Sequence, residues 1–352
     1  MRMFDFSFYR GKKVLITGHT GFKGSWLCCI LANLGAEVIG YSLYDEEENR
    51  LFDLCGVKNR ITHIVGDVRD LEHLKEVFAK YKPEIVIHLA AQPIVRIAYE
   101  KPVDTYTTNV IGTVNILECV RLNPCTKSFL NVTTDKVYEN KEWDKGYVET
   151  DPLDGFDPYS NSKSCSELVT HSYKKSFFAK GLTAISTARA GNVIGGGDFA
   201  RDRIIPDCVR AAMNNEAIIV RNPHSTRPYQ HVLEPLCAYL LIAMKQYLDK
   251  SCEGYYNVGP DDGDSFETCA IVNSFVKYWG NGLKWVDKND GGPHEASLLK
   301  LDCTKIKSAF GWRPKWTLDN AVQKTVEWTK CYIDGGNVRA LMDAQIEEYI
   351  NS

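Results

Sequence analysis

The 352-residue sequence lacks the features that mark membrane and nucleic-acid-binding proteins. No stretch approaches the 18 consecutive apolar residues that a membrane-spanning helix needs, so no membrane partner is expected. A formal net charge of -3 and the lack of a lysine- or arginine-rich run exclude a basic surface for nucleic acid. The chain also has no internal repeat and no low-complexity tract. With 44% hydrophobic residues, it is predicted to be a globular enzyme with a large core.

The twelve cysteines lack the spacing of a disulfide framework. They are scattered along the chain without a CxxC motif, and Cys28 and Cys29 are adjacent. No secretory leader is recognised before the first expected strand. Reduced cysteines in a cytoplasmic protein are therefore expected. The eight histidines show no ligand spacing, and no metal site is predicted.

Short β-branched runs alternate with helical segments through the first half of the chain. Strands are expected at residues 13–17, 37–42, 61–65, 85–89, 128–132 and 182–188, and helices at 25–34, 70–81, 103–122 and 159–178. Mostly apolar strands separated by helices indicate a parallel sheet that is covered on both faces. The sequence therefore predicts an α/β protein with a Rossmann-type doubly wound fold.

The regular alternation ends near Asn192. Glycines and prolines become frequent, and helices are expected at 206–213, 234–247 and 318–331. We predict a nucleotide-binding domain over residues 1–191 and a smaller C-terminal substrate-binding lobe over 192–352. No Ser/Gly-rich spacer separates them, so the two are expected to interdigitate.

A glycine turn follows the first expected strand and precedes a helix. Residues 18–24 read Gly-His-Thr-Gly-Phe-Lys-Gly. Glycines at such a turn let the backbone approach a pyrophosphate while the helix N-terminus faces the anion. An ordinary turn is the alternative, but it does not explain the spacing. The predicted dinucleotide-binding residues here are Gly18, Thr20, Gly21, Phe22, Lys23 and Gly24.

Two pairs of side chains in one short span are suited to proton transfer. Tyr159 and Lys163 are four residues apart on an expected helix, where the ammonium can lower the pKa of the phenol. Asp135 and Lys136 follow an apolar strand, and open α/β folds place their chemistry at that edge of the sheet. A salt-bridged surface turn is the alternative for Asp135 and Lys136.

These motifs resemble the extended short-chain dehydrogenase/reductase family, and within it the nucleotide-sugar 4,6-dehydratases. The glycine turn, residues 88–92 (His-Leu-Ala-Ala-Gln) and Tyr159 with Lys163 occur in the family's order over nearly the whole chain. Such dehydratases usually have Thr-Asp-Glu where this chain has Thr134, Asp135 and Lys136. The lysine, together with residues 189–198 and 227–235, resembles the branch that acts on CDP-D-glucose. Residues 300–306 and 310–314 are similar to the family's closing helices.

The resemblance implies a bound NAD that is reduced and restored within one turnover. It places Ala90, Ala91 and Gln92 beside the nicotinamide and Asn109 in support of the site. Asp67, followed by Val68, is expected at the adenine. One position departs from the family pattern, because Ser42 stands where an acid would favour NAD. Lys23 is therefore a candidate to approach a 2′-phosphate, or else a solvated side chain.

The implied reaction is a 4,6-dehydration in deoxysugar (O-antigen type) biosynthesis. Tyr159 and Lys163 oxidise C4 with help from Thr134, Lys136 removes the C5 proton, and Asp135 protonates the departing C6 hydroxyl. The expected product is CDP-4-keto-6-deoxyglucose. The residues expected to bind the substrate are Asn192, Arg203, Arg227 and His231.

Other functions remain open at this stage. They are a dTDP- or GDP-linked dehydratase, an NAD-dependent nucleotide-sugar 4-epimerase, and a non-catalytic dinucleotide-sensing protein. The family implies a homodimer formed through helices 103–122 and 159–178, although their apolar faces could equally bury against the sheet.

Overall fold

The β-branched runs form one parallel sheet in the computed structural model, which describes residues 5–45, 50–261, 266–288 and 298–352. Its strands follow the order β11-β6-β5-β4-β1-β2-β3, and every pair is parallel. The chain moves from β1 outward in one direction and then in the other, which is doubly wound topology. The predicted Rossmann-type fold is confirmed. The seven strands are β1 (Lys13–Thr17), β2 (Glu37–Ser42), β3 (Thr62–Val65), β4 (Ile85–His88), β5 (Ser128–Thr134), β6 (Ala184–Ala190) and β11 (Tyr255–Val258).

Six of these strands lie where the sequence predicts them, with small shifts at the ends. β5 continues two residues beyond its predicted end, to Thr134, and β6 is shifted toward Ala190. The seventh strand, β11, was not predicted. It is four residues long and carries a buried polar side chain, Asn257, so it does not stand out as an apolar run.

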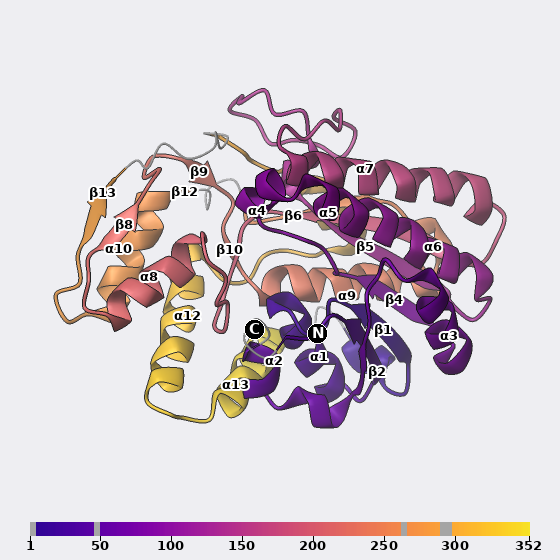
Figure 1. Ribbon diagram of the computed structural model, residues 1–352, viewed down its shortest axis with the longest axis horizontal. Helices are drawn as coiled ribbons and strands as arrows, with labels where there is room; N and C mark the ends of the chain where they lie inside the picture. The colour runs from indigo at the N-terminus through magenta and orange to yellow at the C-terminus, as the bar shows by residue number, and fades with distance from the viewer. Residues whose placement is uncertain (1–4, 46–49, 262–265, 289–297) are drawn as a thin grey trace.

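Helices cover both faces of the sheet (Figure 1). One hydrophobic cluster joins the sheet to α1 and α9, with α13 packed beyond α1. The other cluster joins the opposite face to α3, α6 and α7. The helices of these two layers are α1 (Phe22–Asn33), α9 (Leu233–Leu248) and α13 (Val338–Asn351), then α3 (Leu71–Tyr81), α6 (Gly112–Leu122) and α7 (Pro158–Tyr173).

Two helices that were predicted as continuous contain π-helical turns. Residues 103–122 form α5 (Pro102–Tyr106), a π turn over Thr107–Ile111 and then α6. The Thr107 hydroxyl donates to the main-chain oxygen of Val103 at 2.9 Å, which competes with the regular helix pattern. α7 likewise ends in a π turn over Lys174–Phe178.

The smaller lobe has its own hydrophobic cluster, built from α8, α10, α12 and short strand pairs. Figure 1 shows this lobe to the left of the sheet. Its elements are α8 (Ile204–Met213), α10 (Thr268–Trp279), α12 (Leu318–Ile333), β7 (Val193–Ile194) with β10 (Gln230–His231), β8 (Ile218–Val220) with β13 (Trp285–Asp287), and β9 (Thr226–Arg227) with β12 (Phe266–Glu267).

The chain passes repeatedly between the sheet and the smaller lobe. Both α9 and β11 follow residue 192 in sequence but pack in or on the large sheet. The division at residues 191 and 192 stays a prediction. One expectation for this half was wrong: residues 310–314 do not form a closing helix. Only α11 (Thr304–Phe310) is helical, because Gly311 takes a left-handed conformation (φ 69°) that ends it.

The remaining elements are short connections. They are α2 (Arg50–Leu54), α4 (Val95–Glu100) and 3₁₀ turns at Phe6–Tyr9, Val57–Arg60, Asp135–Val137 and Lys250–Cys252. Within the described ranges, no helix is long and apolar enough to cross a bilayer. The twelve cysteines, all of which are described, are free thiols.

Candidate active site

The carboxyl end of β5 carries Thr134, Asp135 and Lys136. The Thr134 hydroxyl donates to Oδ1 of Asp135 at 2.9 Å, while Oδ2 of Asp135 has no hydrogen bond within the described chain. Asp135 is 1% exposed, and Lys136 is half-buried. Burial raises the pKa of Asp135 more than the Lys136 ammonium lowers it. A carboxyl in this setting is suited to act as an acid, and it is not part of a surface salt-bridged turn.

Tyr159 and Lys163 lie one helical turn apart at the start of α7. Asp157 caps this helix by accepting hydrogen bonds from the main-chain N–H groups of Tyr159 and Ser160 at 2.9 and 3.0 Å. Lys163 Nζ donates to the main-chain oxygen of Val132 in β5 at 3.1 Å. The cap and this hydrogen bond hold both side chains at the end of β5.

The electrostatics of this pair differ from the expectation that Lys163 lowers the pKa of Tyr159. Burial raises the pKa of Tyr159 to about 12, and a hydrogen bond with Thr134 opposes it. Burial also lowers the pKa of Lys163 to about 8, against the raising effect of Glu167. For each group, the cost of removal from water is the largest effect on its pKa. Thr134 thus bonds to Asp135 and also acts on the pKa of Tyr159.

Asn109 joins the segment after β4 to the catalytic helix. Its Oδ1 accepts from the main-chain N–H of Gln92 at 2.8 Å, and its Nδ2 donates to the oxygen of Gln92 at 3.1 Å. The same Nδ2 donates to the Ser162 hydroxyl at 2.8 Å. Asn109 therefore holds residues 90–92 against α7, beside Tyr159.

The glycine turn between β1 and α1 leaves no room for a side chain at Gly18 or at Gly24. A Cβ on Gly18, whose φ is 73°, would lie 2.8 Å from the main-chain nitrogen of Ala90. A Cβ on Gly24 would lie 2.1 Å from the oxygen of Gly18. Gly21 begins α1 without a side-chain cap, so the first N–H groups of the helix, from Phe22 onward, face the turn. This geometry fits the pyrophosphate of a dinucleotide.

The ends of β2 and β3 place the remaining cofactor candidates. Ser42 and Thr20 hydroxyls lie 3.0 Å apart, which ties the glycine turn to β2. Asp67 is bound by Arg69, with distances of 2.6 to 3.0 Å. Burial acts to raise the pKa of Asp67, but the hydrogen bonds from Arg69 outweigh it and lower the pKa. The carboxylate is therefore charged and held in place, with Val68 buried beside it.

Lys23 is half-buried, and its charged neighbours belong to the candidate site. Its Nζ lies 5.9 Å from the centre of the Tyr239 ring. Burial lowers its pKa to about 8, and the charges of Arg203 and Lys163 lower it further while Asp135 opposes them. Because its charged neighbours are active-site residues, the structure gives no support for a 2′-phosphate contact.

Two of the four substrate candidates lie near the catalytic groups. Arg203, paired with Asp198 at 2.9 Å, affects the pKa of Tyr159. Arg227 is 4% exposed and affects the pKa of Asp135. Both cations are placed where substrate phosphates could bind.

The other two candidates lie differently. The main-chain oxygen of Asn192 accepts from Gln230 N at 3.0 Å, which aligns β7 with β10. His231 is fully buried, with its ring 4.8 Å from the Trp316 ring and 6.0 Å from the Trp26 ring. A packing role accounts for this histidine.

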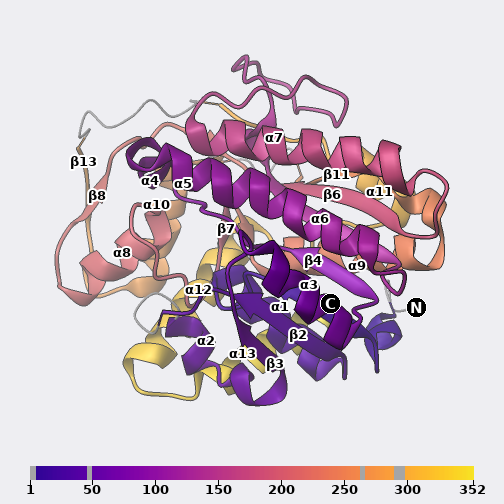
Figure 2. The ribbon, with the colours of Figure 1, turned by 45° about the vertical axis from the view of Figure 1, so that its right-hand side comes forward.

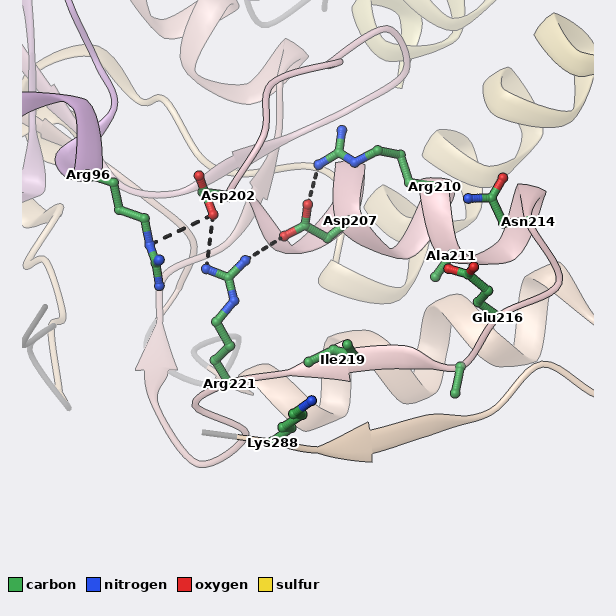
Figure 3. Close-up of a pocket in the computed structure, with 11 residues that line it drawn as sticks. Arg96, Asp202, Asp207, Arg210, Ala211, Asn214, Glu216, Ile219, Arg221 and Lys288 are labelled. Carbon is green, nitrogen blue, oxygen red and sulfur yellow. Dashed lines mark hydrogen bonds and ion pairs between the residues drawn. The ribbon is translucent and has the colours of Figure 1, made fainter. Parts of the chain in front are cut away.

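A charged pocket of about 400 Å³ lies between α8 and β8, and Asp202, the sequence neighbour of Arg203, lines it (Figure 3). Asp202, the neighbour of Arg203, lies 3.8 Å from Arg96 of α4 and 3.1 Å from Arg221 at the end of β8. Arg221 also lies 3.2 Å from Asp207 of α8. Further lining residues include Glu216 and Lys288. This pocket could not be predicted from the sequence, because its charges come from four separate segments.

A group of possible metal ligands lies apart from this site. His224, Glu267 and Cys269 have their ligand atoms within 4.8 Å of one another at the protein surface. The His224 side chain is 79% exposed and bonds to Glu267 at 3.1 Å, as an ordinary surface pair would. The absence of a metal stays a prediction.

Comparison with known proteins identifies close relatives. The family model described as GDP-mannose 4,6 dehydratase matches residues 15–325. The chain is 44% identical to the CDP-glucose 4,6-dehydratase of Salmonella typhimurium, covering 99% of both chains. It is 28% identical to a probable dTDP-glucose 4,6-dehydratase of Sinorhizobium fredii, covering 92% of this chain and 93% of the relative.

Solved structures share the fold. The UDP-glucose 4-epimerase of Thermus thermophilus, solved in complex with NAD, superposes with a TM-score of 0.78 at 25% identity, over 90% of this chain and 98% of that one. The dTDP-glucose 4,6-dehydratase of Bacillus anthracis gives a TM-score of 0.75 at 22% identity, over 93% and 99% of the two chains.

Proposed function

The chain belongs to the GDP-mannose 4,6-dehydratase family, and we propose that it is an NAD-dependent CDP-glucose 4,6-dehydratase that forms CDP-4-keto-6-deoxyglucose. The observation that carries the proposal is the position of Thr134. This threonine donates to Asp135 and lies close enough to Tyr159 to lower the pKa of the phenol, so an acid for C6 and a base for C4 flank one buried hydroxyl. An epimerase has no use for the acid at C6.

The glycine turn and the segment after β4 are the residues that would hold NAD. Gly18 and Gly24 permit the close approach of the pyrophosphate, and residues 90–92 reach the end of the sheet next to α7. When bound, NAD supplies a reversible store for the hydride taken from C4 and returned to C6. Burial raises the pKa of Tyr159, and a cationic nicotinamide ring held beside residues 90–92 would favour its ionised form.

Oxidation at C4 must come first, because the C5 proton is acidic only beside a carbonyl group. Tyr159 accepts the proton of the C4 hydroxyl, and Thr134 hydrogen-bonds the same hydroxyl. Lys163 is positioned one turn away to stabilise the tyrosinate, and its hydrogen bond to Val132 fixes that position. Lys136 then accepts the C5 proton while Asp135 donates a proton to the C6 oxygen, which leaves as water.

The charged pocket between α8 and β8 is proposed to receive the nucleotide end of the substrate. Arg203 links it to the catalytic groups, since this arginine lies near Tyr159 while its neighbour Asp202 lines the pocket. Cytosine presents an amino donor at position 4 and acceptors at O2 and N3. The pocket offers both kinds of partner, with carboxylates such as Glu216 and cations such as Lys288. Uracil and thymine present a carbonyl at position 4 instead.

The test is to incubate the purified protein and NAD separately with CDP-, dTDP-, UDP- and GDP-glucose. We expect a methyl signal from a 4-keto-6-deoxy sugar only with CDP-glucose. With deuterium at C4 of CDP-glucose, the label should appear on the new methyl group. Turnover of dTDP-glucose alone would contradict the cytidine assignment. Conversion to a galactose nucleotide without a methyl group would favour the epimerase.

A homodimer formed through α6 and α7 is also proposed. These helices lie side by side on one face of the sheet (Figure 2). Large apolar side chains remain exposed on α6, on α7, and on α5 and the π turns that adjoin them. They are Val103, Ile111, Leu122, Leu168 and Phe177. Burial of such a patch is the usual reason for self-association. Light scattering should give twice the chain mass of 39.7 kDa, and Leu168→Glu should give the monomer. A cytoplasmic location and an O-antigen type pathway stay predictions.

A further inference from the structure

Tyr239 carries a buried hydroxyl that the fold does not use. Its side chain lies in α9 and is 0% exposed, yet its hydroxyl has no hydrogen-bond partner among the described residues. Buried polar groups in folded proteins almost always have such a partner, and leaving one unpaired costs about 1–3 kcal/mol. An unpaired buried hydroxyl therefore needs an explanation.

The location of Tyr239 supplies one. The charges of Tyr159 and Asp135 both act on its hydroxyl, and Lys23 Nζ lies 5.9 Å from its ring centre. Oδ2 of Asp135 is the second buried polar atom here that lacks a partner in the described structure. Two unpaired polar atoms thus lie close to the same catalytic tyrosine.

The direction of α9 aims the ring at the catalytic end of the sheet. The Ser128 hydroxyl, at the start of β5, donates to the main-chain oxygen of Ala243 at 2.9 Å. Tyr239 is one turn nearer to the start of α9, and therefore nearer to the end of β5. Side chains of a helix lean toward its N-terminus, which brings the hydroxyl further in the same direction.

A packing role explains the ring of Tyr239 but not its oxygen. Other tyrosines that contact α9 have their hydroxyls satisfied. Tyr9 donates to the main-chain oxygen of Leu240 at 2.6 Å, and Tyr349 donates to Glu234 at 2.5 Å. Phenylalanine would fill the place of Tyr239 without an unpaired oxygen. The hydroxyl therefore keeps a hydrogen-bonding capacity that no described residue uses.

We propose that Tyr239 contacts the substrate, and that its hydroxyl and Oδ2 of Asp135 together bind the C6 oxygen of the hexose. This inference rests on the proposed dehydratase function. In the elimination, the C5 proton goes to the Lys136 amine and the electron pair of the C5–H bond forms the C5=C6 double bond. The C6–O bond breaks, and its electron pair stays on the oxygen. That oxygen takes the proton of Asp135 and leaves as water, while Tyr239 donates a hydrogen bond to it.

The experiment separates C4 oxidation from water loss in the variant Tyr239→Phe. CDP-6-deoxyglucose has no C6 oxygen, so it is oxidised at C4 without any elimination, and the absorbance of reduced cofactor measures this step. We expect Tyr239→Phe to oxidise this analogue within about twofold of the wild-type rate. Its dehydration of CDP-glucose should fall on the order of 100-fold, the usual loss when one donor to a departing or charged oxygen is removed. Reduced cofactor should accumulate during that reaction.

Tyr9→Phe is the matched control, because it removes a hydroxyl that contacts the next residue of the same helix, Leu240. It should leave both rates unchanged. Without substrate, Tyr239→Phe should unfold at the same temperature as the wild type or higher, since it removes an unpaired buried group.

Three outcomes would overturn the inference. Unchanged dehydration would mean that Tyr239 packs or holds a structural water. An equal loss of both rates would place its role at C4. If the wild-type protein neither oxidises CDP-6-deoxyglucose nor dehydrates CDP-glucose, the dehydratase function itself is wrong, and this inference with it.

Discussion

The Nζ atom of Lys163 donates a hydrogen bond to the main-chain oxygen of Val132 at 3.1 Å. This bond joins Lys163 of α7 to β5. The end of β5 carries Thr134, Asp135 and Lys136. Lys163 is 5% exposed, so the bond lies in a region with little water. Tyr159 and Lys163 are therefore held at a fixed distance from Asp135 and Lys136, because Lys163 is bonded to the strand that precedes Asp135.

The buried charge of Lys163 makes stability depend on pH. Burial lowers its pKa from 10.5 to about 8. Below pH 8 the lysine is protonated in both states, and the folded state bears the full cost of burial. Between pH 8 and 10.5 the unfolded lysine holds a proton that the folded one has lost, so the free energy of unfolding rises with pH, by at most about 1.4 kcal/mol per pH unit.

Urea unfolding of the wild type and Lys163→Met measures this effect between roughly pH 7.5 and 9.5. We expect the wild type to gain more stability than the variant over that range. Lys23, whose pKa is also lowered to about 8, is present in both proteins. Loss of the Lys163 charge makes the lowering of its pKa smaller in the variant, so Lys23 changes the difference in the same direction. Parallel curves would contradict the assignment of a lowered pKa to Lys163.

Lys136→Met should separate oxidation from elimination. The variant keeps Tyr159, Lys163 and Thr134, so C4 oxidation continues and reduced cofactor accumulates. Without an amine near C5, we expect the keto sugar yield to fall on the order of 100-fold or more. Exchange of the C5 proton with deuterated water should stop. Lys141→Met, which changes an exposed lysine five residues further along the chain, is the control and should keep full activity. Loss of C4 oxidation in Lys136→Met would show that the lysine has a different role.

Glu167→Gln should destabilise the protein strongly. Glu167 is 1% exposed and accepts from Arg189 at 3.0 and 3.1 Å and from Thr187 at 2.8 Å. Loss of the carboxylate leaves the Arg189 guanidinium buried without its counter-charge, which costs about 3–5 kcal/mol. Glu72→Gln breaks the exposed pair with Lys75 and should cost less than about 1 kcal/mol. If urea unfolding shows that Glu167→Gln and Glu72→Gln lose equal free energies of unfolding, this expectation is wrong.

Gly18→Ala should abolish the binding of NAD, whereas Gly11→Ala should not. Both glycines have positive φ angles, 73° and 69°, so each substitution carries the same cost of about 1 kcal/mol in backbone conformation. Only Gly18 is also crowded, by Ala90 at 2.8 Å, while Gly11 has nothing within 4 Å. Calorimetric titration with NAD measures the difference. Similar NAD affinity in the two variants would show that the close approach at Gly18 is unimportant.

Local sequence signals predicted most of the fold. The strand, glycine turn and helix at residues 13–34 follow from β-branched residues and from glycines where side chains would clash. Tyr159 and Lys163 share a face because α-helical spacing requires it. β11 escaped prediction because its four residues lack an apolar pattern, and α13 (Val338–Asn351) was not singled out. The π turn around Asn109 depends on side-chain contacts that a helix pattern does not encode.

The sequence by itself determined which elements form and which side chains share one element, because spacing along a helix or strand sets a face. Only the tertiary structure decided how Lys23 comes to lie over the Tyr239 ring, and how Arg96, Asp202 and Arg221 line one pocket. These residues come from segments separated by tens to hundreds of positions. Their meeting depends on how separate helices and loops pack onto the sheet, and no spacing along the chain records that.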